Sequence, residues 1–239
     1  MNEIVEEIQK KLPDGLIFSV NKPYRWTSSD VVRKVRSVLR YRYNLRKIKV
    51  GHAGTLDPLA TGVLVICVGR ATKQAEEIQA GEKEYIADIR FGATTPCFDL
   101  EKPVNEYFEY EHITCENLET AIKKFIGTIE QIPPLFSAKM INGTRAYEFA
   151  RKGEDVEIKS AKINIRQIEI LKFDLPDVVL KIVCNKGTYI RSIARDLGLE
   201  MQSGAHLINL CRTRSGNFSL DNSLDINDLE KFLENFETK

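Results

Sequence analysis

Residues 51–62, GHAGTLDPLATG, carry a single carboxylate, Asp57, among glycines, a histidine and a proline. Asp57 is held out of helical geometry because the ring of Pro58 clashes with that conformation at the preceding residue. The apolar run at 63–68 is typical of a strand buried on both faces. A loop beside such a strand can hold a carboxylate rigidly as a nucleophile or a charge stabiliser, so Asp57 is the first candidate for chemistry. Asp and Gly also favour turns for conformational reasons alone.

Three aromatic or basic residues stand where predicted strands begin or end. Tyr189 and Arg191 belong to KGTYIR, residues 186–191, which follows a strand and opens a helix. An arginine at this junction can pair with a carboxylate and hold its orientation. Tyr85 begins a strand, where its ring can lie against a flat base. The structural alternatives are core tyrosines with polar tips and a surface arginine on a helix face.

The charge is segregated along the chain, although the net charge is only +1. Residues 22–49 hold ten Lys or Arg and one acid, whereas residues 95–120 hold seven acids and one lysine. Clustered basic side chains contribute most when they neutralise phosphates, so the basic segment predicts a polyanionic partner. A solvated helix face is the alternative interpretation.

Composition excludes several classes of protein. At 239 residues with 43% hydrophobic content, the chain suits one large domain or two small ones. The five cysteines are odd in number and widely spaced, with no CxxC pair, so neither a disulfide framework nor a metal site is indicated. No apolar run approaches the ~20 residues that span a bilayer, and the N-terminus lacks a secretory pattern. We therefore expect a cytoplasmic protein that makes no membrane contact.

Periodicity predicts strands in hairpins mixed with scattered helices, which is typical of an α+β fold. No repeat or linker divides the chain, so a single compact domain is expected. Ser28 or Ser29 is the expected cap of the first helix, and a bulge is expected near Gln167. The expected strands are 16–20, 63–68, 83–92, 163–170 and 178–184, with 205–220 extended; the expected helices are 28–39, 71–79, 118–126, 145–152, 188–201 and 227–236; a turn is expected at Asn142-Gly143.

These motifs, in this order, resemble the tRNA pseudouridine synthases of the TruB type, which isomerise a uridine in the TΨC arm of tRNA. The resemblance covers about residues 15–220. It implies a central mixed, largely antiparallel sheet flanked by helices, with the active site in a basic cleft. The matching segments are Lys22-Pro23 with 28–32, VGHAGTLDPLATGVLVICVGRATK (50–73), KEY (83–85), IPPLFSAKMINGTRAYEFARKG (132–153), NKGTYIRSIARDLG (185–198) and GAHLINLCRTRSG (204–216).

The resemblance implies an isomerisation of uridine 55 in the T-loop, with Asp57 as the catalytic carboxylate. The reaction breaks the N1–C1′ bond, turns the uracil and re-forms the bond at C5, so no cofactor or metal is required. Asp57 could add to C6 of the base, or attack or stabilise C1′ of the sugar. The uridine must first be flipped out, at a cost of a few kcal/mol.

The family's other functional residues transfer to matching positions in this sequence. Tyr85 would stack on the flipped uracil and is a candidate to assist proton transfer, and Arg191 would pair with the catalytic carboxylate. His52 would enter the T-loop and help to extrude the nucleotide. Tyr189 would line the pocket, and Lys22, Lys73 and Leu210 would line the active-site cleft. Independently of the family, segment 22–49 and a second basic, extended segment with Arg212 and Arg214 are expected to contact phosphates.

Two departures from the family pattern stand out. An acidic tail, residues 221–239, follows the last motif where many bacterial relatives continue into a PUA RNA-binding domain. We therefore expect a single catalytic domain over 1–239 with no PUA domain. The loop at 93–99 is less polar than in the family, so only Asp99 is assigned a substrate contact there.

The expected partner is the T-arm of tRNA, bound by a monomer. Two alternatives come from other classes of protein. In an RNA-binding or tRNA-folding protein the isomerisation would be secondary, and a protein-interaction module would show no salt-dependent RNA affinity.

Overall fold

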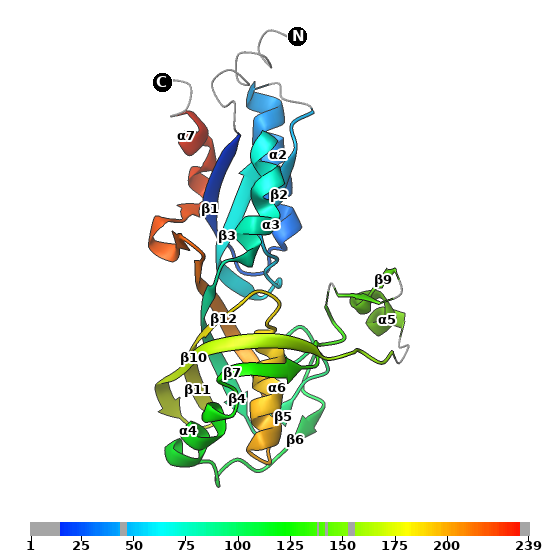
Figure 1. Ribbon diagram of the computed structural model, residues 1–239, viewed down its shortest axis with the longest axis vertical. Helices are drawn as coiled ribbons and strands as arrows, with labels where there is room; N and C mark the ends of the chain where they lie inside the picture. Colours follow the sequence, from blue (N-terminus) through cyan, green and yellow to red (C-terminus); the bar gives the residue numbers. More distant parts are fainter. Residues whose placement is uncertain (1–14, 44–46, 138, 142, 153–155, 235–239) are drawn as a thin grey trace. The chain divides into compact units, whose positions relative to one another are not determined.

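The computed structural model describes residues 15–43, 47–137, 139–141, 143–152 and 156–234 (Figure 1). The chain divides into two compact units. The first unit comprises Met1–Lys83 and Cys211–Lys239, and the second comprises Glu84–Leu210. Strands β4 (Lys83–Phe91) and β12 (Ala205–Ser215) contain the points where the chain passes from one unit to the other. The expectation of a single catalytic domain over residues 1–239 stays a prediction.

The sheet of the first unit is built around β3 (Ala60–Val68), whose residues 63–68 are almost fully buried as the apolar run predicted. β3 pairs antiparallel with β1 (Leu16–Lys22) and with β2 (Val50–His52). β12 follows β3 in the strand order and pairs with β13 (Phe218–Ser219). Gly62 is required where β3 meets β12, because a Cβ there would lie 2.2 Å from the carbonyl oxygen of Arg212 and the residue has a φ of +100°.

Helix α2 (Ser28–Tyr43) packs an apolar face onto the first unit. The predicted cap at Ser28 or Ser29 is wrong by one or two residues. Thr27 is the cap: its hydroxyl accepts from the Asp30 amide at 3.1 Å, and its own amide donates to the Asp30 carboxylate at 2.8 Å. The predicted helix at 71–79 is split into the 3-10 segment η1 (Gly69–Gln74) and α3 (Ala75–Ala80).

The acidic C-terminal segment belongs to the core of the first unit. β14 (Leu224–Asp225) pairs parallel with β1, between the 3-10 segments η2 (Leu220–Asn222) and η3 (Ile226–Asp228). In α7 (Leu229–Glu234), Leu229 and Leu233 are buried, and the Phe232 ring lies 5.1 Å from that of Phe18. Residues 235 and 236 of the predicted helix lie outside the described part of the chain. The segment is therefore more than a solvated tail.

The second unit has the strand order β12–β4–β11–β10–β7. β10 (Ala161–Asp174) pairs antiparallel with β11 (Asp177–Cys184) and with β7 (Gly127–Gln131). The β10–β11 register shifts between Ile165 and Gln167, which confirms the predicted bulge. Two short pairs complete the strands: β5 (Ala93–Thr94) with β6 (Glu106–Tyr107), and β8 (Met140–Ile141) with β9 (Thr144–Arg145).

The helices of the second unit are α4 (Cys115–Lys123), α5 (Ala146–Lys152) and α6 (Ile190–Glu200). On α6 the side chains of Ile193, Ala194 and Leu197 are fully buried. Asn142, in the predicted turn between β8 and β9, lies outside the described residues. The mixed, largely antiparallel α+β fold with flanking helices is confirmed. Across the described ranges, no helix is long and apolar enough to cross a membrane.

Candidate active site

The loop that carries Asp57 connects β2 to β3 and is fixed by side chains from three other elements. At the end of β1, the fully buried Lys22 donates from Nζ to the carbonyl of Pro58 at 3.2 Å. The same ammonium binds the carbonyls of Pro23 at 2.9 Å and Trp26 at 2.5 Å. One buried charge thus joins the residue after Asp57 to the turn that leads into α2.

Ser28 and Arg212 fix the residues that precede Asp57. The buried Ser28 hydroxyl accepts from the Leu56 amide at 2.9 Å and donates to its carbonyl at 3.1 Å. Arg212, on β12, donates to the carbonyls of Gly54 at 3.0 Å and Thr55 at 3.4 Å, and from Nε to Val63 at 2.7 Å. The Asp57 backbone is thus held from both sides, which limits the positions available to its half-buried side chain.

Burial disfavours the charged form of Lys22 and lowers its pKa from 10.5 to about 8. The nearby Asp57 carboxylate partly opposes this shift. Between pH 8 and 10.5 the unfolded chain retains a proton that the folded protein has released, so the stability contribution of Lys22 rises with pH. We expect the free energy of unfolding of the wild type to rise relative to that of Lys22→Met across this window. Urea unfolding at several pH values measures the difference, and parallel profiles would contradict the shift.

His52 is the last residue of β2, directly before the Asp57 loop, and lies opposite Ile66 in the β2–β3 register. Burial lowers the pKa of its imidazole, and the positive charge of Arg212 lowers it further. Among the described residues, none hydrogen-bonds its buried Nδ1. Burial and Arg212 therefore both favour the uncharged form of this half-buried ring.

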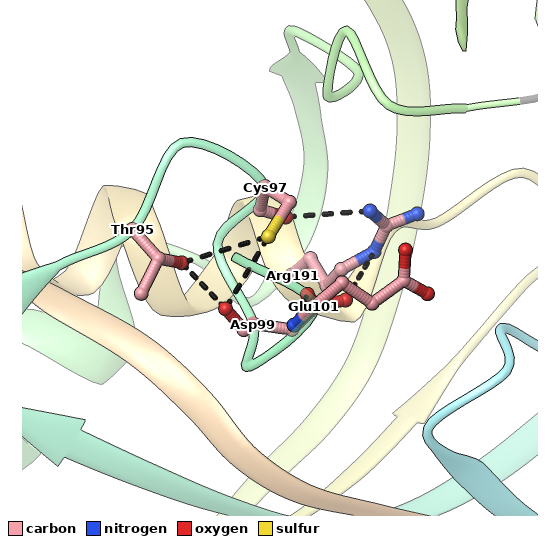
Figure 2. A network of polar contacts seen from close by, with 5 residues as sticks. All are labelled: Thr95, Cys97, Asp99, Glu101 and Arg191. Atoms are coloured by element: carbon pink, nitrogen blue, oxygen red, sulfur yellow. Dashed lines mark hydrogen bonds and ion pairs between the residues drawn. The ribbon is translucent and has the colours of Figure 1, made fainter. Parts of the chain in front are cut away.

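The second unit holds a buried arginine–carboxylate pair (Figure 2). Arg191, on the first turn of α6 and 4% exposed, places its Nε 3.7 Å from Asp99 Oδ2 and donates from Nη1 to the Cys97 carbonyl at 3.3 Å. Asp99 accepts from the Glu101 amide at 2.9 Å. The sequence predicted a substrate contact for Asp99. In the structure the Asp99 carboxylate is paired with Arg191 and orients that side chain.

The Asp99 loop is stabilised from within by Thr95 and Cys97. The Thr95 hydroxyl donates to the Asp99 carbonyl at 2.6 Å, and the Cys97 thiol reaches the same oxygen at 3.3 Å (Figure 2). Both side chains are buried. In this less polar loop, buried side chains therefore hydrogen-bond the backbone carbonyl of Asp99. The Asp99 carboxylate is directed at Arg191.

Tyr189, the cap residue of α6, is fixed by a side chain that sequence reasoning missed. The buried Gln131, at the end of β7, accepts from the Tyr189 amide at 2.9 Å and donates to its carbonyl at 3.1 Å. The amide of Gln131 therefore pairs with the Tyr189 backbone as a neighbouring strand would. A Gln within IEQIPP carries no signal of such a contact, because its partner is 58 residues away.

The remaining predicted residues divide between the units. Tyr85 on β4 and Leu210 on β12 are buried in the second unit. Lys73, in η1 of the first unit, is exposed. Arg212 is only 1% exposed, and its three donor nitrogens bind carbonyls of its own unit. These bonds favour a positioning role for Arg212, and its predicted phosphate contact stays a prediction. Within the described ranges, no group of three or more His, Cys, Asp or Glu is placed to hold a metal ion.

Comparison with known proteins defines the class and then the family. Residues 40–190 match the model of the TruB family pseudouridylate synthase N-terminal domain, and residues 191–239 match the tRNA pseudouridylate synthase B C-terminal domain. Fold and sequence together define a pseudouridine synthase. The chain belongs to the TruB family of these enzymes, which confirms the isomerase class predicted from the motifs.

Curated relatives share most of the chain. It is 54% identical over 220 residues to tRNA pseudouridine synthase B of Parabacteroides distasonis, covering 92% of this chain and 94% of that protein. It is 45% identical to the Clostridium kluyveri protein of the same name, covering 91% of this chain and 72% of that protein. A solved Cbf5-Nop10-Gar1 complex matches with a TM-score of 0.71 and 28% identity, and this chain spans 57% of the matched chain.

Proposed function

We propose that this protein isomerises uridine 55 in the T-loop of tRNA, with Asp57 as the catalytic carboxylate. The observation that carries the proposal is the fixed Asp57 loop, whose backbone is bound by Lys22, Ser28 and Arg212. Breaking and re-forming a glycosidic bond at one nucleotide requires a carboxylate placed within a fraction of an ångström. A turn held only by its own sequence would not give that precision.

Asp57 serves the reaction either by adding to C6 of the uracil or by attacking or stabilising C1′ of the ribose. In both routes the carboxylate meets an electrophilic carbon or developing positive charge, so it must be ionised at the moment when it attacks or stabilises. Tyr85 is proposed to stack on the extruded uracil and assist proton transfer, and Arg191, oriented by Asp99, to supply a positive charge to the pocket. No cofactor enters this proposal, because the base is cleaved and re-attached without net oxidation.

The RNA-binding surface is proposed to include the polar face of α2. Its buried face is apolar, whereas Arg33, Lys34, Arg36 and Arg40 are exposed on the other side. Arg33 pairs with Asp30, and Lys34 lies 3.8 Å from Glu230, so part of this charge is already neutralised. Of the other arginines in segment 22–49, Arg42 also lies on α2, and Arg46 lies outside the described residues. We propose a monomeric, cytoplasmic enzyme whose His52 helps to extrude the uridine.

An unmodified tRNA transcript tests the function directly. We expect the purified protein, in buffer with EDTA, to form one pseudouridine per transcript, mapped to position 55. A transcript with cytidine at position 55 is the matched control and should gain none. Modification elsewhere would reject the T-loop assignment, and tight binding without modification would favour a tRNA-folding role.

A further inference from the structure

The turn between β1 and α2 holds an arginine in a backbone conformation that arginine disfavours. The Trp26 amide donates to the Pro23 carbonyl at 3.3 Å, closing a four-residue turn. Arg25, its third residue, has a φ of +65°. Turns of this kind place Gly or Asn at that position, because a side chain meets steric strain there. An unfavourable residue in an ordered turn indicates a function for its side chain.

The side chains of this turn face solvent. Tyr24 is 49% exposed, and the Arg25 guanidinium lies 5.6 Å from the centroid of its ring. Such stacking orients a guanidinium without neutralising it. No carboxylate within the described ranges is ion-paired with Arg25, whereas Arg33 and Lys34 on the following helix both have acidic neighbours. Arg25 therefore presents an uncompensated, oriented positive charge.

The turn is also tied to the Asp57 loop. Lys22 Nζ binds the carbonyl of Trp26 at 2.5 Å and that of Pro58 at 3.2 Å, so the two segments share one buried ammonium. The backbone of the turn therefore lies beside the residue that follows Asp57, where an RNA strand bound at Asp57 can reach it. The phosphates of the strand carry paired anionic oxygens, to which a planar guanidinium can donate two hydrogen bonds.

We propose that Arg25, supported by the Tyr24 ring, binds a phosphate of the tRNA strand beside the extruded uridine. This inference rests on the proposed function and adds a binding residue to it. The contact helps to hold the flipped nucleotide in place, so it acts on substrate affinity and leaves the chemical step unchanged. The strained turn is maintained because it directs the guanidinium toward the strand that Asp57 acts on.

Arg25→Gly separates this role from a structural one, because the two roles predict opposite changes. Glycine relieves the strain, so the melting temperature should stay the same or rise. Loss of a phosphate contact should raise KM for tRNA about five- to tenfold, with kcat within about twofold of wild type. The slope of log affinity against log salt should become shallower by about 0.7 to 1.

Two further substitutions and one control complete the test. Arg25→Asn keeps a residue that tolerates positive φ and should lose the same affinity, whereas Arg25→Lys should retain part of it. Lys172→Gln removes the same charge at the β10–β11 turn, where Lys172 is paired with Asp174 at 2.9 Å, and should leave KM unchanged. Wild-type affinity and salt slope in Arg25→Gly would overturn the proposal. A wild-type enzyme inactive on tRNA would instead overturn the proposed function.

Discussion

Asp57→Asn should abolish pseudouridine formation, lowering kcat by at least about 10³-fold, while the protein still binds tRNA with wild-type affinity. The amide has nearly the same size as the carboxylate but can neither add to carbon nor stabilise developing positive charge. The loop itself should keep its position, because Lys22, Ser28 and Arg212 bind backbone atoms of its other residues. Single-turnover assays with position-mapped pseudouridine give the rate, and filter binding gives the affinity.

The same substitution provides its own structural check. The Asp57 carboxylate raises the pKa of Lys22 against the effect of burial, so Asp57→Asn should shift the Lys22 titration to below about 8. Nuclear magnetic resonance of the lysine side chain follows this shift. Wild-type turnover by Asp57→Asn would show that the catalytic group lies elsewhere. Loss of tRNA binding together with activity would show that the loop had moved.

The local features of this site were readable from the sequence. Asp-Pro excludes helix, the apolar run at 63–68 requires burial on both faces, and the order of the motifs indicates the family. The bulge near Gln167 followed from a change of phase in the alternation of β10, which is a local signal as well. Each of these properties depends on neighbours within a few residues, and periodicity reports such properties.

The contacts that fix the site depend on pairs far apart in the chain. Arg212 was interpreted as a phosphate ligand because it stands in a basic, extended segment, yet its partners lie 149 to 158 residues earlier. The Asp99–Arg191 pair likewise joins a loop to a helix. Ser28 was expected to cap α2, and its hydroxyl instead binds Leu56. Composition marks such side chains as polar but cannot specify which carbonyl they meet.

The acidic C-terminal segment shows a related limit. Its six acids and two lysines were interpreted as a tail, because charge dominates its composition. The buried Leu229 and Leu233, with Phe232 against Phe18, place one apolar face of this segment in the first unit. The segment therefore packs through this apolar face, while Asp221, Asp225, Asp228 and Glu230 are exposed.

Arg212→Met should destabilise the fold by about 2–4 kcal/mol and lower kcat, while leaving the salt dependence of tRNA binding unchanged. Methionine fills part of the volume, but it leaves the carbonyls of Gly54, Thr55 and Val63 without the donors that Arg212 provides. The first two of these residues precede Asp57 closely, so the loop should loosen as stability falls. Arg90→Met is the matched control, on a strand of the second unit: its partner Asp177 lies 2.7 Å away at an exposed site, where an ion pair contributes about 0–1 kcal/mol. Urea unfolding and single-turnover rates of both variants decide the role.

If Arg212→Met unfolds like the wild type and weakens tRNA binding with a shallower salt slope, Arg212 contacts phosphate after all. If it loses stability and turnover together while Arg90→Met loses neither, the buried guanidinium acts by holding the loop that presents Asp57.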